Sequence, residues 1–181
     1  MLDIKKLQAQ LEIDEGVKYE VYLDSLGLPT FGVGHLVRKS DPEWALWQNR
    51  NGKKVPVTKQ RVAQVFEEDC QSVLRDCSAY IKGFEKLPEE IKQILANMMF
   101  NMGLTKMSKL FVQFRKDLIA ADYKMAAKEM QYNNGRKPTT ESAWYLQTKG
   151  RAQRLVARMD AFANDKMCQV PISPTNPKDL A

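Results

Sequence analysis

The 181-residue sequence predicts an α+β fold, with a small β lobe near the N-terminus and a larger, mostly helical second lobe. Two observations support this fold class. Residues 17–35 alternate between small and large side chains around turn residues, as the strands of a hairpin or a small meander do. From Thr58 onward, apolar residues recur at helical spacing for most of the remaining chain. We expect a long helix to join the two lobes and a cleft to lie between them.

The first elements are predicted from local periodicity and turn residues. Ile4, Leu7 and Leu11 recur at helical spacing and predict a helix over residues 3–14. Gly16 stands where a left-handed helix cap is expected, which places Glu15 in or just past the last turn. The strands of the meander follow in residues 17–35, with a turn at 25–27.

A second group of signals covers the segment that follows the meander. Asp41 at the N-cap and Pro42 at the first helical position predict a short helix. Residues 55–57 read as a short edge strand, and Thr58 as the N-cap of a helix of about 25 residues. The apolar stripe of that long helix consists of Val62, Val65, Phe66, Val73 and Ile81.

The remaining chain predicts a series of helices. A mostly apolar helix begins at Pro88 and ends at Gly103, and its composition indicates a buried core element. Further helices are expected at 106–121, 122–131, 140–147 and 149–165, with a break at 133–138. The proline-rich tail, residues 169–181, is expected to be flexible.

Composition and charge exclude several classes of protein. With 44% hydrophobic and 28% charged residues the sequence is typical of a globular protein, and it has no run of about 18 apolar residues that would span a membrane. The N-terminus lacks the apolar run of a secretory signal peptide, so we expect synthesis in a cytoplasm. The net charge of +6 is spread along the whole chain, which indicates a solvated basic surface rather than a nucleic-acid site.

The cysteines are expected to be unpaired. Cys70 and Cys77 fall in one predicted helix, where seven residues rise about 10.5 Å. A disulfide requires Cα atoms within roughly 7 Å, so the two thiols cannot be joined. They are expected to be small buried hydrophobic residues of a protein made in a reducing compartment.

Three polar residues near the N-terminus suggest catalysis on a glycosidic bond. Such cleavage needs an acid that protonates the leaving oxygen and a carboxylate that activates water, attacks the sugar or stabilises the oxocarbenium ion. Glu15 at a helix end and Asp24 at a strand end form a candidate pair, and the hydroxyl of Thr30 could hold a water against Asp24. By composition and spacing alone, a helix terminus followed by an ordinary turn aspartate is the favoured interpretation.

The local sequence is more specific than the spacing. Residues 13–16 (IDEG), 21–24 (VYLD) and 29–35 (PTFGVGH) closely resemble the opening of the phage-type lysozymes, the family 24 glycoside hydrolases. The family pattern is a glutamate, eight residues, an aspartate, five residues and a threonine, followed by G-x-G-H, and this chain matches it without a gap. The resemblance continues in residues 97–103 (NMMFNMG) and 144–154 (WYLQTKGRAQR).

The resemblance implies a role for each matching residue. Glu15 would be the general acid, Asp24 would activate the water, and Thr30 would help to place it. Arg151 would pair with the catalytic glutamate, and His35 would form a fold-stabilising ion pair with Asp69. The positions implied for substrate binding are Gly32, Leu36, Phe100 and Asn101.

The resemblance also implies a domain organisation. Residues 1–168 would form a phage-type lysozyme domain with a lysozyme-like fold. Its β-hairpin lobe would cover about 16–57, and its helical lobe about 82–166 together with the N-terminal helix. The segments 41–57 and 131–143 depart from the best-known members of the family, and both would lie where a cleft rim can be remodelled.

The implied reaction is the hydrolysis of the β-1,4 bond between N-acetylmuramic acid and N-acetylglucosamine, with inversion. The implied enzyme is a monomeric lysozyme that lyses bacterial cell walls, in the periplasm or outside the cell, with no metal and no cofactor. A lytic transglycosylase of related fold, an inactive wall-binding module and a chitinase-like enzyme stay open as alternatives. The setting, whether phage endolysin, virion tail lysozyme or invertebrate defence lysozyme, is also open.

Three aromatic residues allow two interpretations each. His35, the single histidine, could be a general base, although the ion-pair interpretation is favoured. Trp44 and Trp47, one helical turn apart, could stack on sugar rings, but packing is the commoner use of such a pair. A lone histidine also argues against a zinc amidase or endopeptidase, which needs two or three nitrogen ligands.

Overall fold

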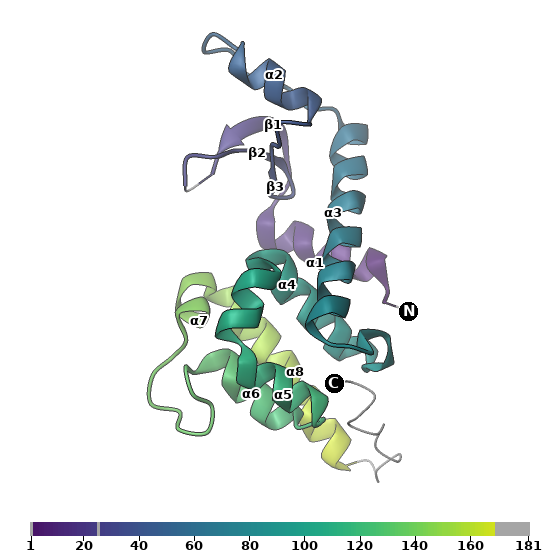
Figure 1. The fold of residues 1–181 in the computed structure, drawn as a ribbon, viewed down its shortest axis with the longest axis vertical. Helices are drawn as coiled ribbons and strands as arrows, with labels where there is room; N and C mark the ends of the chain where they lie inside the picture. The colour runs from purple at the N-terminus through teal and green to yellow at the C-terminus, as the bar shows by residue number, and fades with distance from the viewer. Residues whose placement is uncertain (1, 25, 169–181) are drawn as a thin grey trace. The chain divides into compact units, whose positions relative to one another are not determined.

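The computed structural model describes residues 2–24 and 26–168, and it confirms the α+β class. The predicted tail at 169–181 lies outside the described residues. The described residues form a three-stranded antiparallel sheet and a series of helices (Figure 1). The elements are α1 Ile4–Glu15, β1 Lys18–Leu23, β2 Pro29–Gly32, β3 His35–Leu36, α2 Pro42–Gln48, α3 Lys59–Tyr80, a 3-10 turn Phe84–Lys86, α4 Glu89–Leu110, α5 Val112–Ile119, α6 Tyr123–Gln131, α7 Ala143–Thr148 and α8 Gly150–Cys168.

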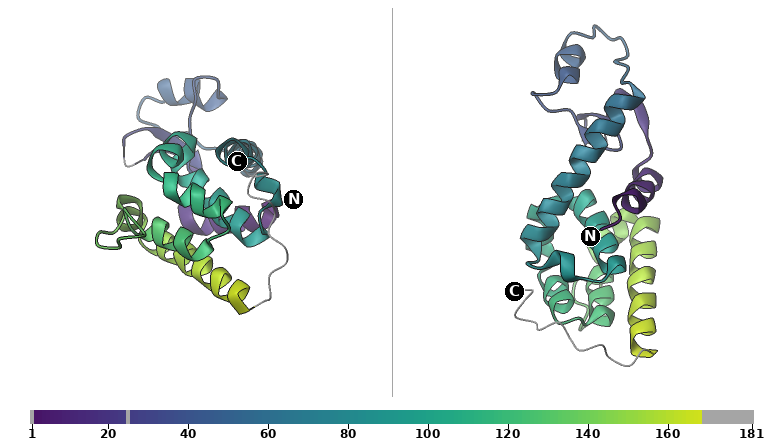
Figure 2. Two further views of the ribbon diagram at one scale, coloured as in Figure 1. Left: turned by 60° about the horizontal axis from the view of Figure 1, so that its bottom comes forward. Right: turned by 90° about the vertical axis from the view of Figure 1, so that its right-hand side faces the viewer.

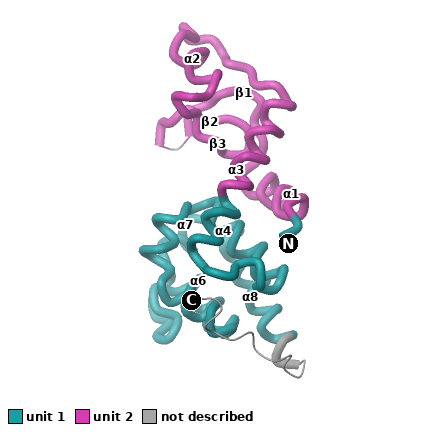
Figure 3. The backbone as a smooth tube through the Cα atoms, turned by 45° about the vertical axis from the view of Figure 1, so that its right-hand side comes forward, with its two compact units in different colours: residues 1–3, 73–181 teal, residues 4–72 magenta. Residues whose placement is uncertain are grey.

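The chain divides into two compact units, which Figure 3 shows in different colours. The sheet unit comprises residues 4–72, and the helical unit comprises 73–181 together with residues 1–3. The boundary falls inside α3, so this helix contributes to both units. The division differs from the expected one because α1 belongs to the sheet unit. Within that unit the side-chain amide of Gln8 donates to the carboxylate of Glu67 at 3.1 Å, which ties α1 to α3.

The sheet is a meander in the order β1-β2-β3. A further segment, residues 55–57, lies along the free edge of β1, where Val21 N–H donates to Val55 O at 2.9 Å and Val57 N–H donates to Tyr19 O at 2.8 Å. The predicted edge strand is thus reduced to a single bridge between Glu20 and Pro56. The two bonds flank the bridge, so the nitrogen of Pro56 faces away from β1, and a proline is tolerated at this edge position.

The sheet unit has its own apolar core. Strand residues on one face of the sheet and valines of the 55–57 segment pack against the first turns of α3. The buried residues of this core are Val21, Phe31, Val37, Val55, Val57, Val62 and Val65. Because successive strand residues point to opposite faces, this burial leaves the other face of the sheet for polar side chains.

Helix α3 begins and packs as its sequence predicts. Its first turn is capped by Thr58, whose Oγ1 accepts a hydrogen bond from Arg61 N–H at 3.1 Å. Cys70 and Cys77 are fully buried and unpaired, which confirms the prediction for these two thiols. Burial raises the pKa of the Cys70 thiol to about 12, and it raises the pKa of the Cys77 thiol as well.

Helix α4 is the buried centre of the helical unit, and most of its first ten residues are inaccessible to solvent. Gly103 interrupts it with a left-handed φ of 73°, at the position where the sequence predicts an end, and helical structure then resumes as far as Leu110. The predicted single helix over 106–121 is wrong, because Phe111 adopts a non-helical conformation and separates α4 from α5. Phe111 is buried, its carbonyl accepts the Tyr80 hydroxyl at 2.6 Å, and its ring meets Trp144 edge to face.

The other helices of this unit enclose α4. Helix α8 contacts α4, α6 and α7, and α5 contacts α6. Figure 2 shows α8, in yellow, alongside its neighbours. In the described part of the chain, no helix is both long enough and apolar enough to cross a bilayer.

The segment between α6 and α7 is held to the helical unit by one arginine. Arg136 donates to both carboxylate oxygens of Asp117 and, at 2.7 Å, to Glu129. Both carboxylates are buried, and Arg136 itself is half exposed. A bridge between Tyr132 and Glu141 closes the base of the segment. Arg136 therefore neutralises two buried acidic groups that belong to different helices.

Replacing Arg136 with glutamine is expected to lower the thermal unfolding midpoint by several degrees at neutral pH. The variant leaves two buried carboxylates close together without their cation. This lowers the stability of the fold more than removing all three charged groups would. Adding Asp117→Asn and Glu129→Gln to this variant should recover most of the loss. Scanning calorimetry of the single and triple variants checks this, and equal midpoints for wild type and Arg136→Gln would contradict it.

Candidate active site

The outward face of the sheet brings together the residues around Thr30. In the strand register, Thr30 is opposite Tyr22 on β1 and Leu36 on β3, and directly opposed residues of an antiparallel sheet share a face. Asp24 follows two positions after Tyr22, just past the end of β1. The Thr30 hydroxyl donates to Leu28 O at 3.1 Å, so its lone pairs are oriented to accept a hydrogen bond.

The turn between β1 and β2 fixes the carboxylate of Asp24. Its Oδ1 accepts two backbone hydrogen bonds, from Leu26 N–H and Leu28 N–H, both at 2.8 Å. The backbone N–H of Asp24 donates to Leu28 O at 2.9 Å and closes the same turn. Among the described residues, Oδ2 of Asp24 has no hydrogen-bond donor. One oxygen therefore anchors the side chain, and the other is available to a ligand or a water.

Glu15 is the last residue of α1, and its position depends on Gly16. Gly16 has a φ of 73°, and its N–H donates to Glu12 O at 2.9 Å, so the helix ends directly after Glu15. The Glu15 carboxylate lies near the turn between β2 and β3, since a Cβ added at Gly34 would be 4.0 Å from its Oε2. Glu15, Asp24 and Thr30 thus belong to one compact unit, with Glu15 exposed and Thr30 buried.

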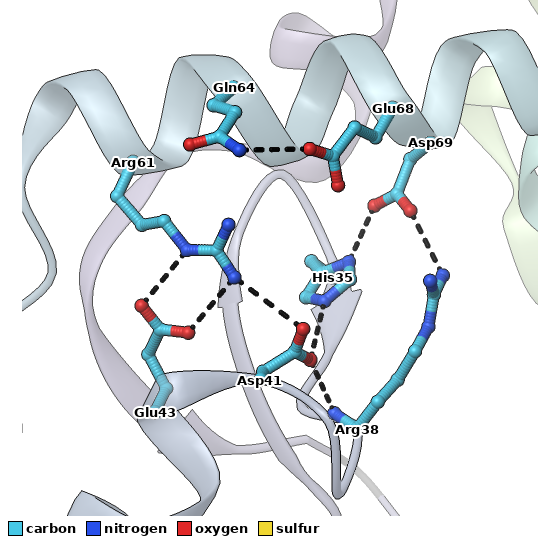
Figure 4. A network of polar contacts seen from close by, with 8 residues as sticks. All are labelled: His35, Arg38, Asp41, Glu43, Arg61, Gln64, Glu68 and Asp69. Atoms are coloured by element: carbon cyan, nitrogen blue, oxygen red, sulfur yellow. Dashed lines mark hydrogen bonds and ion pairs between the residues drawn. The ribbon is translucent and has the colours of Figure 1, made fainter.

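His35 lies between two carboxylates (Figure 4). Its Nδ1 is 2.7 Å from Asp69 Oδ2, and its Nε2 is 3.2 Å from Asp41 Oδ2. Burial lowers the pKa of His35, but the hydrogen bonds and charges of Asp69 and Asp41 outweigh it, and the pKa is raised overall. Both ring nitrogens are engaged, so the geometry favours the structural interpretation of His35 over that of a general base.

This network includes charged residues that sequence reasoning missed. Asp41 occupies the N-cap position of α2, yet its side chain does not cap the helix. It accepts instead from Arg38 N–H at 2.6 Å and pairs with Arg61 at 3.4 Å. Arg61 also binds the buried Glu43, at 3.1 and 3.2 Å. One feature of the sequence could have revealed this network. Arg61 and Asp69 are eight residues apart on α3 and therefore lie on the same stripe of the helix.

Trp44 and Trp47 are packing residues in this structure. Both contact the valine core of the sheet unit and remain partly exposed. The guanidinium of Arg50 lies 3.5 Å from the ring centroid of Trp47 and covers one of its faces. This geometry supports the packing interpretation of the pair over sugar stacking.

Two of the implied substrate-binding positions belong to the sheet. Gly32 has a φ of 63°, and a Cβ added there would approach Val62 Cγ1 to 3.2 Å. A glycine at this position is therefore explained by its backbone conformation and by close packing against α3. Leu36 is 46% exposed on the same face as Thr30. Their roles in substrate binding stay predictions.

The remaining implied residues lie in the helical unit. Arg151 is buried, and it donates to the side-chain oxygen of Asn97 at 2.8 Å and to the Asn97 carbonyl at 3.2 Å. Asn101 accepts a hydrogen bond from the indole N–H of Trp144 at 3.0 Å, and Phe100 beside it is half-buried. The pairing of Arg151 with Glu15 stays a prediction.

A pocket of about 190 Å³ opens beside Trp144 in the same unit. Phe111, Tyr132 and Trp144 supply aromatic walls, and Lys109 and Asn133 supply polar groups. Aromatic surfaces with a few polar groups are typical of small-molecule pockets. In the described residues, no group of three or more histidine, cysteine, aspartate and glutamate side chains is placed to hold a metal ion.

The α+β fold, with an acidic pair beside its small sheet, defines a lysozyme-like protein. The model of the phage lysozyme family matches residues 12–158, and the chain belongs to this family. It is 30% identical over 158 residues to the pre-baseplate central spike protein Gp5 of Enterobacteria phage T4. That match covers 80% of this chain and 26% of the spike protein, so the chain spans about a quarter of this relative.

Two further relatives are similar over nearly their whole length. The probable T4-type lysozyme 2 of Dictyostelium discoideum is 29% identical over 170 residues, and the probable T4-type lysozyme 1 of the same organism is 25% identical over 173 residues. Each match covers 85% of this chain and 93% of the relative.

Proposed function

We propose that the protein is a lysozyme, a peptidoglycan hydrolase that cleaves the β-1,4 bond between N-acetylmuramic acid and N-acetylglucosamine. The observation that carries this proposal is the carboxylate of Asp24. Two backbone N–H groups hold its Oδ1, and its Oδ2 is left for a ligand on the sheet face of Thr30. Membership of the phage lysozyme family supports the same function.

In the proposed mechanism, Glu15 and Asp24 divide the proton transfers. Glu15 gives its proton to the leaving glycosidic oxygen as the bond breaks. Asp24 takes a proton from the attacking water through Oδ2. Thr30 accepts a hydrogen bond from that water, because its own hydroxyl proton is already donated to Leu28 O. Attack by water from the face opposite the leaving group inverts the anomeric carbon.

Three residues outside the sheet unit have proposed roles as well. We propose that Arg151 orients the catalytic glutamate and that Phe100 and Asn101 contact the glycan chain. The hydrogen bond from Trp144 to Asn101 supports a fixed orientation for the Asn101 amide. The protein would act as a monomer on the walls of bacteria, without metal or cofactor, and would cause lysis.

Digestion of purified sacculi, followed by mass spectrometry of the muropeptides, tests this proposal. The expected products carry reducing N-acetylmuramic acid ends, and the first-formed anomer is α, as observed by proton NMR during the reaction. Main products with 1,6-anhydro ends would show a lytic transglycosylase instead. Binding to sacculi without cleavage would show a wall-binding module, and preferred cleavage of plain N-acetylglucosamine polymers a chitinase-like enzyme.

A further inference from the structure

Tyr22 stands at the centre of the candidate site without a role in the proposed mechanism. It is opposite Thr30 in the strand register, so the two side chains share a face of the sheet. It is also two positions before Asp24, whose carboxylate is in electrostatic range of its hydroxyl. It is partly buried. Among the described residues, its phenol hydroxyl has no hydrogen-bond acceptor.

The ring of Tyr22 is held from one side by a cation. The ammonium of Lys18, on the same strand, lies 4.2 Å from the ring centroid. A tyrosine has only two side-chain torsions, and this contact favours one orientation of its ring. The hydroxyl is therefore presented in a limited range of positions.

The charge around Tyr22 keeps its hydroxyl protonated. Burial raises the pKa of Tyr22, and the neighbouring carboxylates of Glu15 and Asp24 raise it further. The group is thus a permanent hydrogen-bond donor over the pH range in which a glycosidase works. It has two carboxylates in electrostatic range and no bond to either among the contacts of the described residues.

We propose that Tyr22 is a substrate-binding residue, whose phenol hydroxyl donates a hydrogen bond to an oxygen of the sugar on which Glu15 and Asp24 act. The inference rests on the proposed function and adds a residue to it. A partly exposed donor without a protein acceptor bonds to water in the free protein, so it can turn to a ligand oxygen without giving up a protein contact. Sugar hydroxyl and N-acetyl oxygens are suitable acceptors.

The test uses the full-length protein and a matched control tyrosine. Tyr19 lies on the same strand, is 46% exposed and has Lys59 at 5.9 Å from its ring centroid. Tyr22→Phe is expected to lower kcat/KM on soluble peptidoglycan about tenfold, the effect of one lost hydrogen bond, with an unchanged thermal midpoint. Tyr19→Phe should stay within about twofold of wild type, since Tyr19 does not share this position.

A binding measurement distinguishes a direct contact of Tyr22 with the sugar from an indirect effect on the carboxylates of Glu15 and Asp24. In the Glu15→Gln background, calorimetric titration with a tetrasaccharide of alternating N-acetylglucosamine and N-acetylmuramic acid should be weakened about tenfold by Tyr22→Phe. Unchanged affinity, with or without a shifted pH profile of cleavage, would overturn the proposal. If Tyr22→Phe does not fold, Lys18→Met, which frees the ring but keeps the hydroxyl, should weaken the affinity about threefold.

The two proposals fail in different ways. A wild-type protein that binds the tetrasaccharide but does not cleave sacculi would overturn the hydrolase function and leave the Tyr22 contact to be measured by the titration. Cleavage and binding that are both insensitive to Tyr22→Phe would overturn the Tyr22 contact alone. A wild type that neither cleaves nor binds would overturn both.

Discussion

Glu15→Gln is expected to lower the rate of sacculus cleavage about 10²–10⁴-fold, the range that a general acid contributes. Glutamine has the size of glutamate but no proton that it can give to the leaving oxygen. Because Glu15 is exposed at the end of α1, the substitution disturbs no packing, and the fold should be retained. Loss of turbidity of a sacculus suspension gives the rate, and circular dichroism checks the fold.

A second carboxylate on the same helix supplies the control. Glu12 is exposed, and its backbone carbonyl accepts from Gly16 in the helix cap, a bond that does not involve its side chain. Glu12→Gln removes the same charge and is expected to leave the rate within about twofold of wild type. If Glu15→Gln clears sacculi as fast as Glu12→Gln does, Glu15 is not the acid.

Asp69→Asn is expected to lower the free energy of unfolding by roughly 2–3 kcal/mol near pH 5, the largest loss of stability that we expect in the sheet unit. His35 is buried against this carboxylate at 2.7 Å, and Asp69 is itself largely shielded from solvent. The variant keeps a hydrogen-bond acceptor but leaves the charged imidazole with only Asp41 opposite. Urea unfolding at several pH values measures the effect.

The pH dependence of this loss follows from the two shifted groups. The pKa of His35 is raised above its ordinary value of 6.5, so its contribution is complete below that pH and is lost as the pH rises through the folded-state pKa. Burial opposes the shift of Asp41, but hydrogen bonds from Arg38 and His35 lower its pKa below 3.8. Its contribution is complete above that pH and is lost on acidification. The network is therefore strongest between pH 3.8 and pH 6.5.

Glu68, the exposed neighbour of Asp69 in Figure 4, provides the control. It bonds to Gln64 rather than to His35, so Glu68→Gln should change stability by less than about 0.5 kcal/mol at either end of the pH range. A loss in Asp69→Asn that is the same near pH 5 and near pH 9 would show that the carboxylate acts without the charge of His35.

Sequence alone predicts those features of the fold and site that depend on neighbouring residues. Thr58 and Gly16 mark helix ends by their own chemistry, and the meander follows from alternation within a single stretch. Glu15, Asp24 and Thr30 emerge as candidates because their local sequence resembles a known family. All three lie in the sheet unit, and their catalytic roles stay predictions.

The features that sequence missed depend on partners far along the chain. Nothing near Phe111 indicates a helix break, which accompanies a hydrogen bond from Tyr80 and a contact with Trp144. Asp41 has every local sign of a helix cap, yet His35 and Arg61 draw its side chain away. In each case a tertiary contact outweighs a local preference.

Cys70 and Cys77 have a consequence for how the protein responds to oxidants. Both thiols are fully enclosed on α3, and their raised pKa keeps the reactive thiolate form at a negligible population. Oxidants and disulfide-exchange catalysts act on thiolates, so burial and the raised pKa protect both positions. Both thiols are thus expected to stay reduced in reducing and in oxidising surroundings alike.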